Sequence, residues 1–342
     1  MNRLTVIDSF EDSMYDDRLA RSPGAHIFHT SAWGRVLSLS YGYSPVYLSQ
    51  ITKNEFSFLL PLMSVDSMLT GHRGVSLPFT DFCEPIVKSE TISLKDLLET
   101  IPHRRWRYIE FRGTESLAGE STPYCRYLRH AVNLTLGRDG LYKRIRGNVR
   151  RNITRAGKSG ISVKVDHSTE AMESFYRLNC LTRKRHGLPP QPVKFFHHLQ
   201  REIISRHLGT LILAMYRRRA IAGAVYLHFN KKVVYKYGAS DYHYQAMRPN
   251  NLIMWTALDR FSANGFHTLD LGRTETDQEG LRRFKLAWGA HEVPLSYFRY
   301  DLRSRAWCPP KPRSRNRTAS LFRLLPVNLL QTCGALLYKH AG

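Results

Sequence analysis

The sequence predicts an α/β protein with a mixed sheet, and three observations support this fold class. The chain has 342 residues, enough for about two domains at roughly 150 residues per domain. Apolar residues make up 42% of the chain and aromatic residues 11%, so sizeable cores can form. Segments with the alternating pattern of strands follow segments with helical periodicity along the chain, as is typical of α/β proteins.

The first half of the chain contains a well-delimited helix among short strands. Thr30 or Ser31 is suited to cap the N-terminus of this helix, and Gly42 is suited to end it. Pro78 and Pro85 exclude a regular helix from the loop that contains them. The other elements expected here are strands over 46–51, 56–65, 107–111 and 131–136 and a short helix over 93–101.

A basic helix opens the second half. Leu141, Ile145 and Val149 recur at the spacing of one helical face, and Gly157 and Gly160 end the helix. Basic residues cover its other faces: Lys143, Arg144, Arg146, Arg150, Arg151, Arg155 and Lys158. Such a helix suits a polyanionic partner. The alternative is a basic helix that is only solvated, which has the same pattern of residues.

The elements after this helix occur in a distinctive order. They are a strand over 161–165, helices over 169–186 and 193–207, strands over 211–216, 221–229 and 233–239, a helix over 249–264, a strand over 268–271, a helix over 281–287 and a strand over 294–300. The three central strands form an antiparallel meander, because only short turns separate them. The whole order resembles the GNAT fold, that is, the acyl-CoA N-acyltransferase fold.

The charge balance is the strongest compositional signal. Lys and Arg number 51 against 28 Asp and Glu, which gives a formal net charge of +23. Such an excess favours a polyanionic partner: nucleic acid, a phosphorylated precursor or an anionic membrane face. The sign of the charge does not choose among these three.

Several functional classes find no support in the motifs. The five cysteines are odd in number and widely spaced, and no HExxH occurs, so neither a disulfide framework nor a metal site is expected. The Gly157-Lys158-Ser159 stretch is not a phosphate-binding P-loop, since Asn152 replaces the required glycine. Without GxSxG or GxGxxG, hydrolase and dinucleotide-binding functions are not indicated either.

The ends of the chain bear on its location. The N-terminal stretch is acidic where a signal peptide would be apolar, and no apolar run reaches 18 residues, so we expect a cytoplasmic protein. Residues 302–342 form a basic, proline-containing tail that ends in an amphipathic helix. Residues 303–340 suit peripheral contact with an anionic membrane at its inner face, and a helix docked on the protein body is the alternative.

One segment near the C-terminus carries a specific pattern. Leu269-Asp270-Leu271-Gly272-Arg273 ends a strand in an acidic residue and a glycine, and Phe284-Lys285 follows about a dozen residues later. This pattern resembles the C-terminal signature of the FemABX peptidyltransferases and of the related BioF2-like acetyltransferase domains. In those proteins, a D-[FL]-G strand end and a [FY]-K pair flank the acceptor cleft.

The resemblance extends over almost the whole chain. FHTSAWGRV, NVRRNITRAGKSGISV, VYKYGASDYHYQAMRPNNLIMW and the tail PVNLLQTCGALLYKH agree with it. It implies tandem GNAT-like subdomains, over 1–137 and 138–301, with the acceptor in the cleft between them. Bridge-forming members often carry a lysine where this chain has Leu37, so the same contact to a UDP-linked acceptor is not expected.

The acyl donor is suggested by the loop over 239–250. GNAT enzymes that use acetyl-CoA bind its pyrophosphate with bare N–H groups of a glycine-rich loop at this place. Here the loop lacks glycine, Pro249 removes an N–H donor and Asp241 adds a negative charge. Acyl-CoA is therefore disfavoured, and an aminoacyl-tRNA donor, with no tightly bound cofactor, suits both the loop and the basic helix. Arg150 and Arg151 on that helix are candidate tRNA contacts.

Lys285 is the first candidate catalytic residue. Attack of an amine on an activated acyl group creates an oxyanion that a cation must stabilise. We expect the Lys285 ammonium to supply this charge, with Phe284 packing beneath it. The alternative is a surface lysine paired with Glu279 or Glu292.

Asp270 is the second candidate catalytic residue. It can orient the acceptor amine or accept its proton, and capping the Gly272 turn is the alternative role. Arg273 is suited to a phosphate or carboxylate of the acceptor. Tyr237 and Asp241 are weaker candidates for substrate binding.

Together these features predict an acyltransferase of the cell envelope. We expect it to join an acyl group from aminoacyl-tRNA to an amine of a peptidoglycan or other UDP- or lipid-linked precursor. An acyl-CoA-dependent N-acyltransferase for an amino sugar or lipid-linked exopolysaccharide is the alternative enzyme. A GNAT-like module that binds tRNA or membrane without catalysis is an alternative of another class.

Overall fold

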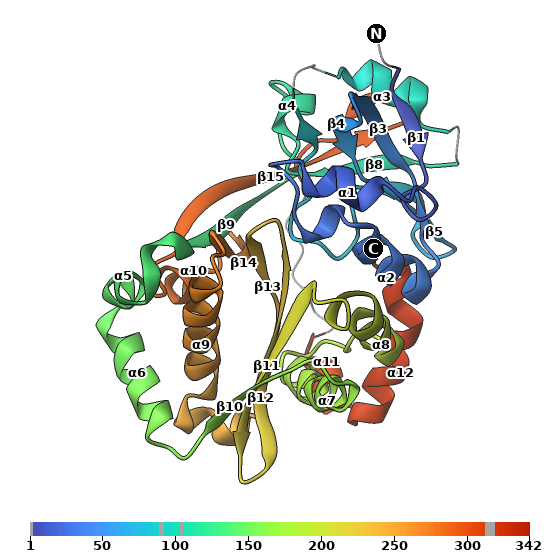
Figure 1. The fold of residues 1–342 in the computed structure, drawn as a ribbon. Helices are drawn as coiled ribbons and strands as arrows, with labels where there is room; N and C mark the ends of the chain where they lie inside the picture. Colours follow the sequence, from blue (N-terminus) through green and yellow to red (C-terminus); the bar gives the residue numbers. More distant parts are fainter. Residues whose placement is uncertain (1–2, 89–91, 103–104, 312–318) are drawn as a thin grey trace. The chain divides into compact units, whose positions relative to one another are not determined.

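The computed structural model describes residues 3–88, 92–102, 105–311 and 319–342, which form two compact units (Figure 1). Unit 1 comprises 1–128, 294–314 and 337–342, and unit 2 comprises 129–293 and 315–336. The tail over 302–342 therefore contributes residues to both units. The subdomain limits at 137 and 301 remain a proposal.

Unit 1 contains two sheets. One has the strand order β1-β3-β4-β7, and the other has the order β15-β8-β6-β5-β2 within this unit, with β16 paired to β15. The strands are β1 (Thr5–Ile7), β2 (Ser44–Pro45), β3 (Tyr47–Thr52), β4 (Glu55–Leu60), β5 (Met63–Ser67), β6 (Gly71–Val75), β7 (Ile86–Val87), β8 (Tyr108–Arg112), β15 (His291–Asp301, from Pro294 on in this unit) and β16 (Ala306–Trp307). The helices are α1 (Tyr15–Ala20), η1 (Ile27–His29), α2 (Ser31–Tyr41), α3 (Leu94–Thr100), α4 (Glu115–Ala118) and η5 (Tyr338–His340).

Local chemistry explains the limits of these elements. The Thr30 hydroxyl accepts a hydrogen bond from the N–H of Trp33 at the start of α2, and Gly42 ends the helix with φ +74°. Both features confirm the predicted helix. The predicted strand over 56–65 is instead two strands, β4 and β5, because Pro61 between them has no N–H to donate.

Unit 2 is a sheet covered by helices on both faces. Strands β10, β11, β12 and β13 pair in antiparallel order, β14 pairs with β13 in parallel, and β9 follows β14. Figure 1 shows α5, α6 and α9 on one face of β11–β13, and α7 and α8 on the other. This agrees with the predicted mixed sheet and with the predicted element order. The strands are β9 (Cys125–Asn133, from Arg129 on in this unit), β10 (Ser162–Asp166), β11 (Gly209–Tyr216), β12 (Arg219–Phe229), β13 (Lys232–Ser240) and β14 (Thr268–Glu275). The helices are η2 (Leu134–Leu136), α5 (Gly137–Arg144), α6 (Gly147–Gly157), α7 (Thr169–Arg185), α8 (Val193–Leu199), the π-turn η3 (Gln200–Ile204), η4 (Tyr242–Met247), α9 (Pro249–Ala263), α10 (Glu279–Leu286), α11 (Ala319–Leu324) and α12 (Val327–Leu337).

The basic helix is the main correction to the predicted elements. It is not one helix but two, α5 and α6, and Ile145 between them has an extended backbone with ψ 133°. The N–H of Arg146 donates to the carbonyl of Ala287, 2.9 Å away, instead of to the preceding helical turn. Leu141, Ile145 and Val149 are nevertheless all buried. The apolar spacing was thus a sound guide to burial and not to helix continuity.

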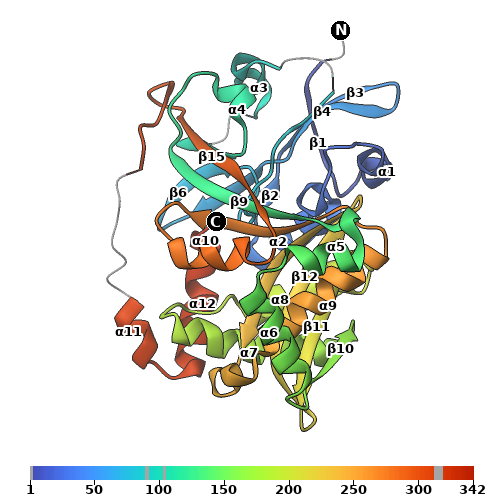
Figure 2. The same cartoon turned by 90° about the vertical axis from the view of Figure 1, so that its left-hand side faces the viewer.

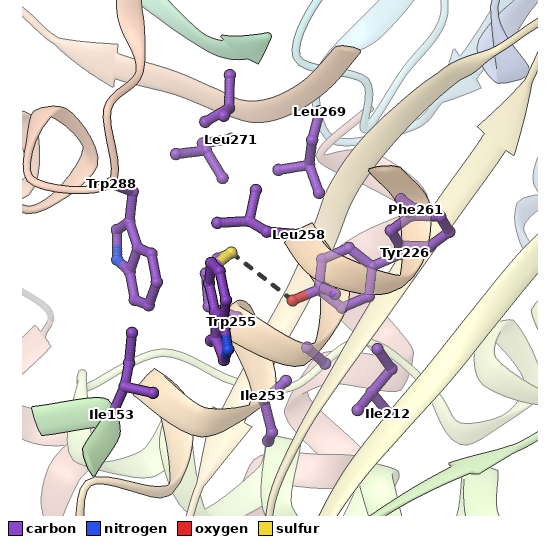
Figure 3. Close-up of a cluster of buried hydrophobic side chains, with 14 of the residues drawn as sticks. Ile153, Ile212, Tyr226, Ile253, Trp255, Leu258, Phe261, Leu269, Leu271 and Trp288 are labelled. Atoms are coloured by element: carbon purple, nitrogen blue, oxygen red, sulfur yellow. Dashed lines mark hydrogen bonds between the residues drawn. The ribbon is translucent and has the colours of Figure 1, made fainter. Parts of the chain in front are cut away.

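A hydrophobic cluster holds the helices of unit 2 against the sheet. Figure 3 shows Trp255 and Leu258 of α9 near Leu269 and Leu271 of β14 and near Trp288, which follows α10. Burying each such large side chain contributes roughly 1.5–3 kcal/mol. This packing positions β14 and the end of α10, which carry the two candidate catalytic residues, Asp270 and Lys285.

The C-terminal helix of the tail is docked. In both views α12 runs beside α7 (Figures 1 and 2), and the Gln331 amide lies 3.4 Å from the Tyr176 hydroxyl. Gly334 fits against the loop before α8, since a Cβ there would lie 1.9 Å from the carbonyl oxygen of Pro190. These contacts agree with the alternative in which the tail helix docks on the protein body. Residues 312–318 of the basic stretch lie outside the residues that the structure describes. Within the described ranges, every helix is too short or too polar to cross a membrane.

Candidate active site

Lys285 is buried at the base of the candidate site. Its side chain on α10 leaves the residue only 5% exposed, and Nζ donates to the carbonyl oxygens of Gly272 at 2.8 Å and Arg273 at 2.9 Å. Gly272 lies in β14 with φ +75°, a conformation that favours glycine and turns its carbonyl toward the ammonium. The alternative of a surface lysine is therefore wrong. These two carbonyl dipoles fix the position of the ammonium.

Asp270 lies two residues before this glycine, and its oxygens have defined partners. Oδ1 accepts a hydrogen bond of 2.7 Å from the N–H of Gly272, and Oδ2 forms an ion pair with Arg129 on β9. The first contact is the capping role that we considered as an alternative. A carboxylate with these two donors is better placed to orient Gly272 and the neighbouring carbonyl than to take up a proton.

A buried histidine completes the charged network, and the sequence did not point to it. His130 on β9 is fully buried, with Nε2 3.1 Å from Glu292 and Nδ1 3.4 Å from the hydroxyl of Thr274. Arg282 holds Glu292 by contacts of 2.5 and 2.7 Å, and this hydrogen bonding lowers the pKa of Glu292. Burial, helped by the charge of Lys285, lowers the pKa of His130. His130 is thus held as a neutral ring near neutral pH.

Three other predicted residues occupy different surroundings. Arg273 follows Gly272 and offers its carbonyl to Lys285, so its backbone belongs to the site. Phe284 is 44% exposed, and its ring faces Trp288 at 6.5 Å between centroids. Tyr237 on β13 packs against Phe196 of α8 at 5.6 Å.

The loop between β13 and α9 is closed by its own hydrogen bonds. The N–H groups of His243 and Tyr244 donate to the side chain and the carbonyl of Asp241, at 3.1 and 3.2 Å. The N–H of Arg248 donates to Gln245, and Pro249 opens α9 without an N–H. Three backbone donors of this loop, those of His243, Tyr244 and Arg248, are therefore used within the loop itself.

Asp241 itself is a buried carboxylate in this loop. It contacts His243 at 2.8 Å and Arg219 at 3.4 Å. Burial acts to raise its pKa, and the hydrogen bonds from His243 outweigh this and lower it. Asp241 therefore carries a negative charge at neutral pH.

Arg150 and Arg151 lie on α6, a different element from the α10 helix that carries Lys285. With Tyr142, Gly147 and Thr154 they line a hollow of about 460 Å³ on the surface of α5 and α6. The guanidinium of Arg150 lies 5.7 Å from the ring of Tyr142. This surface is basic and open, as a nucleic-acid contact requires.

The structure thus joins some predicted residues and separates others. Lys285, Asp270 and the Arg273 carbonyl meet around Gly272, whereas Asp241 and the two arginines of α6 belong to other surfaces. Arg129 and His130 were missed because we placed the start of that strand at residue 131. An earlier start would have included both, since β9 begins at Cys125.

Comparison with known proteins agrees with this fold. Residues 143–286 match the family model described as the acetyltransferase (GNAT) domain. No curated protein has a significant sequence match to the chain.

Three solved structures have similar folds at low sequence identity. The crystal structure of FemX is 15% identical with a TM-score of 0.68, over 88% of this chain and 98% of FemX. L-PGS from Bacillus licheniformis is 12% identical with a TM-score of 0.57, over 92% and 96% of the two chains. A tandem GNAT protein from the clavulanic acid biosynthesis pathway is 10% identical with a TM-score of 0.53, over 91% and 100%. Residues 143–286 therefore form a GNAT acetyltransferase domain, and the chain shares its fold with FemX and with the tandem GNAT protein, as its resemblance to the FemABX proteins predicted.

Proposed function

We propose that this protein transfers an aminoacyl group from aminoacyl-tRNA to an amine of a peptidoglycan or other cell-envelope precursor. The observation that carries this proposal is the closed loop between β13 and α9. An acyl-CoA pyrophosphate needs bare N–H groups at this place, and here those of His243, Tyr244 and Arg248 bond within the loop, beside the negative charge of Asp241. A donor that is held by contacts elsewhere, such as tRNA, avoids this conflict.

The charge of the molecule supports the same donor. The formal net charge is +23, and α6 exposes a basic face that includes Arg151 and Arg155. Lys and Arg contacts to phosphates supply most of the non-specific affinity for nucleic acid. The FemABX resemblance, and the fold shared with FemX and L-PGS, support aminoacyl transfer and an acceptor from the cell envelope.

The reaction we propose is an ester aminolysis. The acceptor amine attacks the aminoacyl carbonyl, a C–N bond forms, and the C–O bond to the terminal ribose of the tRNA breaks. The amine loses a proton and the leaving ribose hydroxyl gains one. Lys285 stabilises the oxyanion of the tetrahedral intermediate, and Asp270 holds the Gly272 turn that orients the lysine.

An acyl-CoA-dependent N-acyltransferase for an amino sugar or a lipid-linked exopolysaccharide is the second candidate. The family model that matches residues 143–286 is an acetyltransferase model, which favours this alternative. It requires the pyrophosphate to be held by side chains rather than by the loop backbone.

A donor competition assay distinguishes the two. The purified chain is incubated with a cell-envelope precursor mixture and either labelled aminoacyl-tRNA or labelled acetyl-CoA, and products are identified by mass spectrometry. We expect label only from aminoacyl-tRNA. Label only from acetyl-CoA overturns the proposed donor and supports the second candidate.

A further inference from the structure

Unit 2 has a basic pocket that the proposed reaction does not use. It has a volume of about 820 Å³ and lies where α7 ends, beside the loop between β13 and α9. Pockets of this size accommodate ligands as large as a nucleotide. We refer to it as the α7 pocket.

Four cationic side chains from three separate elements line the α7 pocket. Lys184 and Arg185 come from the last turn of α7, Arg219 from the start of β12 and Arg323 from α11. Basic residues are common in the last turn of a helix, because they complement its dipole. This accounts for the two residues of α7 and not for Arg219 or Arg323, which come from elsewhere in the chain.

The positive charge of the pocket exceeds its negative charge. Asp241 is the one carboxylate among the residues that line the pocket, and it pairs with Arg219 at 3.4 Å, so the lining holds four cations against one anion. Among the described residues, no carboxylate lies within ion-pair distance of Lys184, Arg185 or Arg323. A surplus of cations around one hollow favours an anionic ligand, and phosphate is an anion that arginine and lysine commonly bind.

The pocket also presents an aromatic surface. Tyr242 is 62% exposed, and the guanidinium of Arg185 lies 5.4 Å from the centroid of its ring. Tyr244 lines the pocket as well, with its ring 5.9 Å from that of Tyr216. An exposed ring beside cations is the combination that binds a nucleobase together with its phosphates.

We propose that the α7 pocket binds a nucleoside phosphate. The phosphates contact Lys184, Arg219 and Arg323, and the base stacks on Tyr242. This chemistry is common to a UDP-linked acceptor, to the 3′ end of a tRNA and to the ADP part of an acyl-CoA. The inference rests on the charge and shape of the pocket and does not depend on the donor proposed above.

Isothermal titration of the intact chain tests the pocket. The probes are UDP, a short RNA ending in CCA, CoA and inorganic pyrophosphate, each titrated into the wild type and into the double variant Lys184→Ala/Arg219→Ala. We expect at least one nucleotide probe to saturate its binding at or below about 1 mM. The double variant should raise the Kd for that probe by about tenfold or more, which corresponds to the loss of at least one charge-assisted contact. Arg177→Ala is the matched control, because Arg177 is exposed on α7 and does not line the pocket. It should change Kd less than twofold.

A second variant tests the base-binding half of the proposal. Tyr242→Ala should weaken the nucleotide probe at least fivefold, since stacking on an aromatic ring contributes that much or more. It should leave the Kd for pyrophosphate unchanged. Equal effects on both probes would overturn the base-stacking assignment, and thermal unfolding of each variant checks that the fold is intact.

The outcomes separate this proposal from the proposed function. Absence of saturable binding by all nucleotide probes, or binding that the double variant leaves unchanged, overturns the pocket. If CoA binds and the double variant weakens its binding, the result supports the pocket and argues against the tRNA donor. UDP or RNA bound in the same way supports the pocket, and the choice between them identifies the source of the nucleotide.

Discussion

Each unit of this protein buries a carboxylate on a strand beside an arginine, and the two networks are built differently. In unit 1, Glu110 on β8 contacts Arg112 at 3.0 Å and Arg299 at 2.7 Å. The Arg299 guanidinium also lies between two tyrosine rings, 4.1 Å from Tyr108 and 4.0 Å from Tyr124. Every charge in this network meets an opposite charge or an aromatic face.

In unit 2 the cation next to the carboxylate is held differently. Asp270 pairs with Arg129, whereas Lys285 donates to the carbonyl oxygens of Gly272 and Arg273. Two carbonyl dipoles fix the direction of the Lys285 ammonium, whereas a shared carboxylate and aromatic rings fix the guanidinium groups of unit 1. We expect the unit 1 network to stabilise the fold, and the unit 2 network to position Lys285 for the reaction proposed above.

The largest expected effect follows from removing the unit 1 carboxylate. Burial acts to raise the pKa of Glu110, and the charges of Arg112 and Arg299 outweigh it and lower the pKa to about 2. Glu110→Ala leaves both guanidinium groups without their carboxylate, so we expect the free energy of unfolding to fall by about 3–5 kcal/mol. Urea denaturation measures this loss.

The control for Glu110 is an exposed pair in the same unit. Lys95 and Glu99 lie 3.9 Å apart and are 82% and 66% exposed, so Glu99→Ala should barely alter the urea midpoint. Activity per folded molecule should remain unchanged in Glu110→Ala. A selective loss of activity at full stability would contradict the structural role assigned to this network.

Changing the unit 2 cation should affect the rate instead. Lys285→Ala removes the charge proposed for the oxyanion, and we expect the rate of acyl transfer to fall by about 10²–10³. Single-turnover kinetics with saturating acceptor measure this step. Arg283→Ala, an exposed neighbour on α10, should keep the wild-type rate.

This prediction also separates an enzyme from a binding module. If folded Lys285→Ala protein transfers acyl groups at the wild-type rate, the catalytic assignment is wrong. If wild-type protein binds tRNA and transfers nothing, the chain acts as a binding module.

The two units should also lose stability in different pH ranges. Burial, with His167 and His207 nearby, lowers the pKa of His228 in unit 2 to about 4. The unfolded chain, with a histidine pKa near 6.5, binds a proton first, so stability is complete above about pH 6.5 and is lost as the pH falls toward 4. This shift corresponds to roughly 3 kcal/mol. Glu110 in unit 1 loses its contribution only as the pH falls from about 4.5 toward 2.

Hydrogen exchange between pH 7 and pH 4 tests this order, and protection should fall first in unit 2. His228→Gln should flatten the pH dependence of unit 2 in that range. Equal losses in both units above pH 5 would contradict the order.

The smallest expected effect concerns the basic surface of α6. If Arg150 contacts a tRNA phosphate, Arg150→Ala should weaken binding uniformly and reduce the slope of log K against log salt by about 1. Filter binding across a salt series measures the slope. Lys95→Ala in unit 1 should leave the slope unchanged, and an unchanged slope in Arg150→Ala would indicate a merely solvated helix.

Much of the fold could be predicted because it depends on local chemistry. The helix from Ser31 to Tyr41 was predicted from its capping residues, and the meander of β11, β12 and β13 from its short turns. Arg217 and Lys231 in those turns have positive φ angles of 47° and 60°, as such tight connections require. Such signals involve residues only a few positions apart, so they can be recognised in the sequence.

The break between α5 and α6 shows where local patterns fail. The apolar spacing from Leu141 to Val149 is continuous, and the helix stops because the N–H of Arg146 bonds to Ala287, far along the chain. Periodicity reports which face is buried, and a distant hydrogen-bond partner decides whether the backbone stays helical.

The candidate site divides in the same way. The sequence by itself determined the element order, the surplus of positive charge, the glycine-free loop and the Asp270, Gly272 and Lys285 positions that resemble the FemABX signature. The tertiary structure alone decided that Arg129 pairs with Asp270, that His130 lies beside Thr274, and that α7, β12 and α11 surround one pocket. Those contacts join residues more than a hundred positions apart or from separate elements. They depend on strand neighbours and helix packing, which no short stretch of sequence specifies.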